Sequence, residues 1–200
     1  MHQYRTPKKS WINIDSDSDF SLANLPYGVF KTSRSNPRVG VAIGAQILDL
    51  AALFDLGFFA DLGLNNNPFA TDSLNEFMAL GRPIWTQTRQ RILDLLDDQN
   101  AELSSKTALH AEVLILQTDA QMLMPVQVPN YTDFYSSQEH ATNVGKMFRP
   151  DGEPLLPNWK HIPVGYHGRA SSILVSGTPI RRPWGQLLPP DANQPVFAPC

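Results

Sequence analysis

Residues 38–50 carry the clearest folding signal in the first part of the chain, reading Arg38-Val-Gly-Val-Ala-Ile43, then Gly44-Ala45, then Gln46-Ile-Leu-Asp-Leu50. Two apolar runs are separated by two residues, and the first of the two is glycine. This spacing is typical of a β-hairpin, because glycine readily adopts the positive φ that tight hairpin turns require. The sequence therefore predicts a hairpin here, and the apolar residues after Leu50 predict a turn into a helix.

Two helices are predicted downstream of this hairpin. Asp72 or Ser73 would cap the first, which runs to about Leu80 and ends at Gly81. The second has Pro83 near its first turn. Its apolar stripe, spaced by three or four residues, predicts packing against the core rather than a partner-binding groove; the stripe comprises Ile84, Thr88, Ile92, Leu95 and Leu96.

The chain changes character near residue 125. Residues 112–116 and 120–125 are predicted to be strands or extended segments that lead to this boundary. Twelve of the seventeen prolines fall at or after Pro125, which predicts loops and short strands. In that second part, residues 171–176 and 180–182 are expected to pair across a turn at residues 177–179.

Composition excludes several classes of protein. The chain has 200 residues, 42% of them hydrophobic, and a formal net charge of −3 without a basic block, which argues against nucleic-acid binding. A single cysteine, Cys200, suits a reducing compartment. No apolar run is long enough to span a membrane, and the basic start of the chain is followed by polar residues instead of a signal-peptide core. The cytosol is therefore the expected location.

The second informative stretch reads Tyr131-Thr-Asp-Phe-Tyr-Ser-Ser-Gln-Glu-His140. Residues 136–139 have the S-x-x-E spacing of a capping box, which predicts a helix from Ser136 to about residue 148. Asp133 and Tyr135 would then lie on the loop that enters the helix, and His140 about one turn inside it. Arg149 would close the helix before a proline.

An acid, a phenol and an imidazole placed around one helix start suit polar chemistry. The residues alone leave a structural interpretation open, in which Asp133 is a turn residue, His140 a satisfied helix histidine and Arg149 a solvated helix end. A zinc site that adds His161 and His167 is rejected, because their flanks contain no cysteine and no H-x-x-x-H pair.

Long strings in the chain strongly resemble the fumarylacetoacetase family. The resemblance covers nearly the whole chain apart from about the first fifteen residues and a few loops. It is carried by the stretch from Tyr131 to Arg149 and by Asn24-Leu-Pro-Tyr-Gly-Val-Phe30, Val39-Gly-Val-Ala-Ile-Gly44, Leu156-Pro-Asn-Trp159, Pro163-Val-Gly-Tyr-His-Gly-Arg-Ala-Ser-Ser-Ile173 and Val175-Ser-Gly-Thr-Pro-Ile-Arg-Arg-Pro183.

This resemblance implies a mixed, mainly β fold in two parts. Residues 1–125 would form a small N-terminal domain with the character of an SH3-like barrel. Residues 126–200 would begin a mixed β-roll catalytic domain, here truncated. Family members are homodimers, so a homodimer is expected of the full-length protein.

The resemblance also implies metal-dependent hydrolysis of a carbon–carbon bond in 4-fumarylacetoacetate, which gives fumarate and acetoacetate in the last step of tyrosine degradation. His140 matches the general base, and Asp133 matches a ligand of a Ca²⁺ or Mg²⁺ ion. Tyr135, Arg149 and Tyr166 match substrate-binding positions. Arg149 suits a carboxylate-bearing substrate, because its guanidinium can bind a carboxylate through two parallel hydrogen bonds.

One departure from the family pattern limits these expectations. The family's three further acidic metal ligands, and the glutamate that orients the base, correspond to sequence beyond Cys200. The chain is therefore expected to be an N-terminal portion that is inactive alone. Two alternatives remain: another superfamily member that hydrolyses, decarboxylates or tautomerises a related oxo-acid, or a non-catalytic chain that binds a full-length partner.

Overall fold

The first part of the chain folds around a five-stranded antiparallel sheet with strand order β4-β3-β2-β1-β5. The structure is a computed structural model that describes residues 9–200, so the basic start of the chain, which was not expected to begin a signal peptide, lies mostly outside the described residues. The predicted hairpin is confirmed as β2 and β3, and Gly44 takes a φ of +54° in its turn. The strands are β1 (Tyr27–Thr32), β2 (Ser35–Ile43), β3 (Gln46–Asp49), β4 (Leu114–Leu116) and β5 (Gln121–Leu123).

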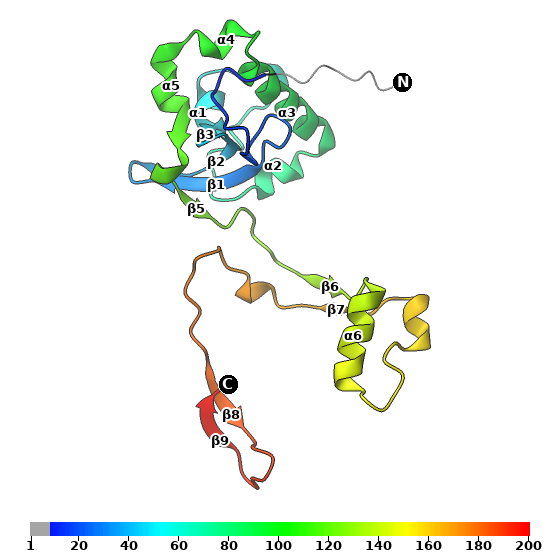
Figure 1. The fold of residues 1–200 in the computed structure, drawn as a ribbon. Helices are drawn as coiled ribbons and strands as arrows, with labels where there is room; N and C mark the ends of the chain where they lie inside the picture. Colours follow the sequence, from blue (N-terminus) through cyan, green and yellow to red (C-terminus); the bar gives the residue numbers. More distant parts are fainter. Residues whose placement is uncertain (1–8) are drawn as a thin grey trace.

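Helices gather on one side of this sheet, as Figure 1 shows. The core lies between them, because alternate residues of the strands, among them Val29, Val39 and Val41, join helix residues in one buried cluster. The helical elements are α1 (Leu50–Asp55), η1 (Ala60–Leu62), α2 (Asn75–Ala79), α3 (Arg82–Leu96), α4 (Ala101–Ser104), α5 (Thr107–Val113) and η2 (Gln117–Asp119).

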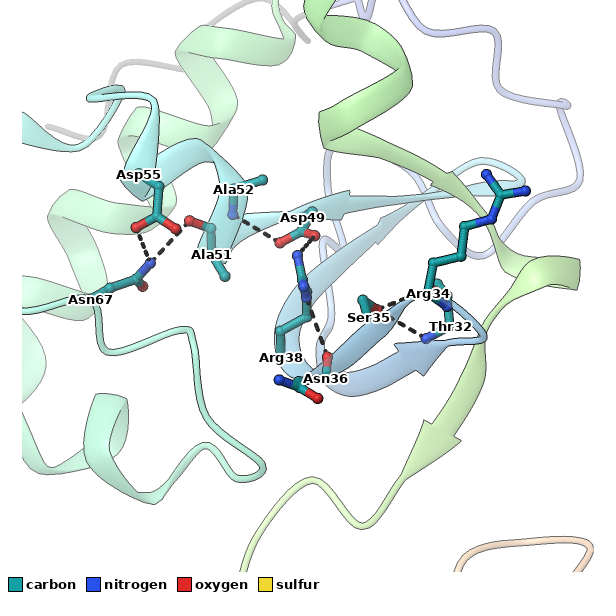
Figure 2. Close-up of polar contacts among 10 residues, drawn as sticks. All are labelled: Thr32, Arg34, Ser35, Asn36, Arg38, Asp49, Ala51, Ala52, Asp55 and Asn67. Atoms are coloured by element: carbon teal, nitrogen blue, oxygen red, sulfur yellow. Dashed lines mark hydrogen bonds and ion pairs between the residues drawn. The ribbon is translucent and has the colours of Figure 1, made fainter.

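Asp49 joins the hairpin to α1 (Figure 2). Its Oδ1 accepts the backbone N–H of Ala52 at 3.0 Å and so caps the helix, and its Oδ2 accepts from Arg38 Nη1 at 3.0 Å. The carboxyl is only 2% exposed, and burial raises its pKa in spite of these donors. The helix predicted after residue 50 is therefore present, and it starts where this acid satisfies the free N–H groups.

The predicted stripe on α3 is confirmed, since Thr88, Ile92, Leu95 and Leu96 are buried. The prediction for the preceding helix was only partly right. α2 begins at Asn75, and its N-cap, Leu74, makes no side-chain capping bond. Neither Asp72 nor Ser73 caps it, because the backbone of Ser73 is instead held by the hydroxyl of Thr71.

The segment predicted as extended over residues 112–116 is half wrong. Its first two residues complete α5, and only Leu114–Leu116 pair as β4. Helices α4 and α5 were not predicted. α4 has four residues and α5 has seven. At the start of α4, Asn100 Oδ1 accepts the backbone N–H of Glu102 at 2.8 Å and so caps the helix. Such short elements show little apolar periodicity in the sequence.

Beyond residue 125 the chain is extended and forms small separate units (Figure 1). Two antiparallel pairs are present, β6 with β7 and β8 with β9. The predicted pairing of residues 171–176 with 180–182 is wrong. The hydroxyl and the N–H of Thr178 both donate to the carbonyl of Val175. In addition, the two prolines in 179–183 have no backbone N–H to donate to a neighbouring strand. The elements are β6 (Thr132–Phe134), α6 (Gln138–Phe148), η3 (Pro157–Lys160), β7 (Gly165–His167), η4 (Ala170–Ser172), β8 (Trp184–Leu187) and β9 (Val196–Pro199).

The expected mixed fold with a small N-terminal sheet domain is confirmed. Among the described helices, none combines the length and the apolar character needed to cross a membrane.

Candidate functional site

Helix α6 carries the predicted imidazole, and its start lies one residue later than expected. Ser137, not Ser136, is the N-cap: its Oγ accepts the backbone N–H of His140 at 3.2 Å and donates to Glu139 Oε2 at 3.2 Å. Glu139 therefore sits at the second helical position instead of the third, which a capping box requires. The predicted C-terminal end is confirmed, since α6 ends at Phe148 with Arg149 as its C-cap.

Asp133 lies on a strand, and the prediction that placed it on a loop is wrong. β6 pairs with β7 in a register that sets Asp133 directly opposite Tyr166. The Tyr166 hydroxyl donates to Asp133 Oδ2 at 2.5 Å. This hydrogen bond to the carboxylate is the main reason that the pKa of Tyr166 rises to about 12, although the side chain is exposed. Tyr166 is therefore a neutral phenol whose hydroxyl donates to this carboxylate.

Tyr135 links this pair to the helix. It follows the last paired residue of β6, and its ring lies edge-on to the ring of His140, with centroids 5.4 Å apart. The ring of Tyr166 lies edge-on at 6.2 Å. The structure thus brings together Asp133, Tyr135, His140 and Tyr166, which we call the phenol–imidazole cluster. It combines a carboxylate, two phenols and an exposed imidazole, a set that can hold a polar substrate and move a proton.

Arg149 stands apart from this cluster and closes a loop. Its Nε donates to the carbonyl of Glu153 at 3.2 Å and its Nη2 to the carbonyl of Pro154 at 2.7 Å. Within residues 9–200, Nη1 makes no hydrogen bond. One edge of the guanidinium is therefore committed to the backbone.

This loop approaches α6 closely because residue 145 is glycine. A Cβ at Gly145 would overlap the carbonyl of Pro154, which the guanidinium of Arg149 binds. The loop and the helix enclose a cavity of about 320 Å³. Its lining is mostly apolar and includes Tyr135, Arg149 and Trp159, whereas the other three members of the phenol–imidazole cluster lie outside it.

The described residues do not form a divalent-cation site by themselves. A hard cation prefers six or more oxygen ligands, most often carboxylates. Across residues 9–200, no three His, Cys, Asp or Glu side chains lie close enough to hold a metal ion together. Asp133 is the only carboxylate in the phenol–imidazole cluster, and Tyr166 already occupies one of its oxygens. These residues alone do not fit such an ion.

Two residues that shape the site were missed in the sequence. Gly145 permits the close loop, but a glycine inside a helix gives no local sign of what approaches it. Trp159 donates its indole N–H to the carbonyl of Tyr135 at 2.8 Å. A half-buried indole must find an acceptor, which is a usable signal, although the sequence does not say which acceptor it finds.

Comparisons with known proteins identify relatives of this chain. Residues 23–125 match the profile of the fumarylacetoacetase N-terminal family. Over 192 residues, or 96% of the chain, it is 50% identical to the fumarylacetoacetase of Caenorhabditis elegans and equally to that of Homo sapiens. It is 42% identical to that of Arabidopsis thaliana over 193 residues. Each match covers 46% of the relative, so the chain spans about half the length of the curated relatives it matches.

Proposed function

Since the chain belongs to the fumarylacetoacetase family, we propose that it is the N-terminal portion of an enzyme that hydrolyses 4-fumarylacetoacetate to fumarate and acetoacetate. The observation that carries this proposal is the phenol–imidazole cluster. Asp133, His140 and Tyr166 come from β6, α6 and β7, and Tyr135 directly follows β6. The four residues meet at one place in a chain that is 50% identical to the fumarylacetoacetase of Caenorhabditis elegans over 192 residues.

His140 is the general base in this proposal. Its imidazole is exposed at the start of α6, beside the ring of Tyr135. It takes a proton from water while the oxygen attacks the substrate carbonyl. The carbon–carbon bond then breaks, and its electron pair leaves with the acetoacetate half as an enolate. The proton returns from the imidazolium to that enolate, which balances the reaction.

Tyr135, Tyr166 and Arg149 bind substrate in this proposal. The Tyr166 hydroxyl donates to Asp133 Oδ2, so the two side chains are held as one polar unit. Arg149 offers Nη1 to a carboxylate of the substrate, while its other donors hold the 150–154 loop. A guanidinium fixed in this way loses less side-chain entropy on binding.

The family implies a divalent cation, and we propose Asp133 as its one ligand in this chain, with Mg²⁺ or Ca²⁺ as the ion. When bound, the ion would polarise the substrate's oxygens as a Lewis acid. Because the residues described here do not complete such a site, further carboxylates must come from outside them. We therefore propose that the 200-residue chain does not turn over substrate alone.

Two domains are proposed, residues 1–125 and 126–200. The family profile ends at residue 125, where three hydrogen bonds hold the departing chain against the start of α2. Leu74 N–H donates to the carbonyl of Pro125 at 2.8 Å, and the amide of Asn75 both donates to and accepts from the backbone of Gln127. A homodimer of the full-length protein and a cytosolic location belong to the same proposal.

The test is a chimera that joins residues 1–200 to the remaining part of the Caenorhabditis elegans relative. We expect it to consume 4-fumarylacetoacetate, measured by the loss of substrate absorbance. His140→Ala should abolish turnover, whereas His161→Ala, which removes another exposed histidine of the same segment, should leave it intact. Equal activity in the two variants would contradict the assignment of His140 as the general base. EDTA-sensitive turnover by the 200-residue chain alone would refute its proposed inactivity.

A further inference from the structure

Tyr135 is held unusually firmly for a residue outside a strand. The β6–β7 pairing stops at Phe134, yet both backbone groups of Tyr135 have partners. Its N–H donates to the carbonyl of Val164 at 2.8 Å. Its carbonyl accepts the indole N–H of Trp159, also at 2.8 Å. The first bond continues the direction of the sheet, whereas the second depends on a single side chain.

Trp159 is itself fixed in place by η3. Pro157 starts this short turn, and the N–H of Trp159 donates to the carbonyl of Leu156 at 3.0 Å. The carbonyl of Asn158 then accepts the N–H groups of the two residues that follow the turn. The indole lies half-buried at the edge of the 320 Å³ cavity, which Tyr135 also lines. The donor therefore belongs to a half-buried side chain on a hydrogen-bonded turn.

The hydrogen bond from Trp159 affects more than the orientation of the Tyr135 carbonyl. The backbone at Tyr135 sets the direction of its Cα–Cβ bond, so holding the Tyr135 carbonyl also restricts where the ring can lie. Among the described residues, only the Tyr135 ring contacts both the imidazole of His140 and the ring of Tyr166. Freed from Trp159, the carbonyl would reorient toward water, and the ring would leave its edge-on position against His140.

We propose that Trp159 is a positioning residue, which holds Tyr135 in register with His140 and Tyr166 without touching substrate. Its value to catalysis rests on the proposed function, whereas the geometric part does not. Trp159 lies twenty-four residues from Tyr135 in sequence, so it reaches the phenol–imidazole cluster only through the fold.

The test uses NMR of the 200-residue chain. The ring protons of His140, assigned by their loss in His140→Asn, should shift in Trp159→Phe, because the ring current of Tyr135 no longer acts on them from the same position. The matched control is Trp184→Phe, which removes an exposed indole on β8 and should leave the His140 resonances unchanged. Unchanged His140 resonances in Trp159→Phe would overturn the proposal.

Local unfolding is separated from loss of one donor by a second variant. Trp159→His keeps a ring N–H and should return the His140 resonances part of the way to their original positions. The amide of Gly168 donates to the carbonyl of Tyr131 at 2.7 Å. It should stay protected from hydrogen exchange in Trp159→Phe, Trp159→His and Trp184→Phe. Loss of that protection together with absence of rescue by histidine would assign Trp159 a purely structural role and reject the proposal.

Activity supplies an independent readout in the chimera. There, Trp159→Phe should lower kcat about ten- to a hundredfold with little change in KM, as expected when a catalytic group is misplaced but substrate contacts survive. If no chimera turned over substrate, the proposed function would fail while the NMR result still stood. A shift of the His140 resonances without any change in kcat would remove the catalytic part of the inference.

Discussion

The two parts of the chain hold their important residues in place by different means. In the described residues, every buried apolar side chain except Ala141 lies at or before Val113. After residue 130, large apolar side chains are mostly exposed, including Phe148 at 77% and Phe197 at 68%. The candidate site lies entirely in this second part and is assembled from individual hydrogen bonds. A core maintains the first part, whereas a few directional contacts maintain the second.

The largest expected effect tests this contrast directly. Phe69 is fully buried, and its ring contacts those of Phe54, Phe59 and Phe77. Phe69→Ala should lower the free energy of unfolding by about 3–5 kcal/mol, because it removes apolar contacts and leaves a cavity. Urea denaturation followed by far-UV circular dichroism measures the loss.

The control for this variant is the same substitution in the second part. Phe197 is exposed on β9 and contacts the ring of Trp184. Phe197→Ala should leave the main unfolding transition where it is. Similar losses from the two variants would show that the two parts share one cooperative core, against the contrast drawn above.

The second prediction concerns the close contact in the second part. Gly145→Ala would place a Cβ against the carbonyl of Pro154 and should displace the 150–154 loop. Overpacking of this kind costs about 1–3 kcal/mol, here confined to the local unit. Hydrogen exchange of the loop amides should increase while the main unfolding transition stays constant. At Gly152 a Cβ would meet only Arg149 Cβ at 3.8 Å. Gly152→Ala should therefore change neither the hydrogen exchange of the loop amides nor the main unfolding transition.

The same contrast explains what could be predicted from the sequence. The β2–β3 hairpin, the α3 stripe and the C-terminal end of α6 follow from the local sequence, and all three are present. The β6–β7 pairing was not predicted, because a three-residue strand that pairs across more than thirty residues leaves no periodic pattern. For that reason Asp133 was expected on a loop. The site residues were identified by resemblance, and their partners Trp159 and Gly145 became evident only in the structure.

The third prediction asks whether burial or an ion pair controls Asp49 in the first part. Burial is the larger influence and raises its pKa, and Arg38 opposes it. A carboxyl whose folded pKa is raised adds stability below its ordinary pKa, and that stability is lost as pH rises through the folded value. The free energy of unfolding of the native protein, minus that of Asp49→Asn, should therefore fall as pH increases from about 3.5. A difference that grows with pH would show that the pair with Arg38 dominates.

The smallest expected effect concerns Tyr27 in the first part, which we compare with Tyr166 in the second. The pKa values of both tyrosines rise to about 12. Tyr27 is raised by burial, and its hydroxyl has no hydrogen-bond partner among residues 9–200. Tyr27→Phe should raise the free energy of unfolding by about 1 kcal/mol at neutral pH, since it removes an unsatisfied buried donor. Thermal denaturation measures this gain, and a loss instead would reveal a partner for the hydroxyl.

Tyrosinate absorbance then separates the two causes. Asp133→Asn should lower the pKa of Tyr166 toward its ordinary value of 10.0 in the folded chain, because the carboxylate that favours its protonated form is gone. Tyr27 should remain at about 12 in that variant, and should return to its ordinary value only when urea unfolds the first part. If the pKa values of both tyrosines returned to the ordinary value in Asp133→Asn, the second part would have to stabilise the first. A change in Tyr166 alone would show that a single hydrogen bond, with no core around it, sets the chemistry of the site.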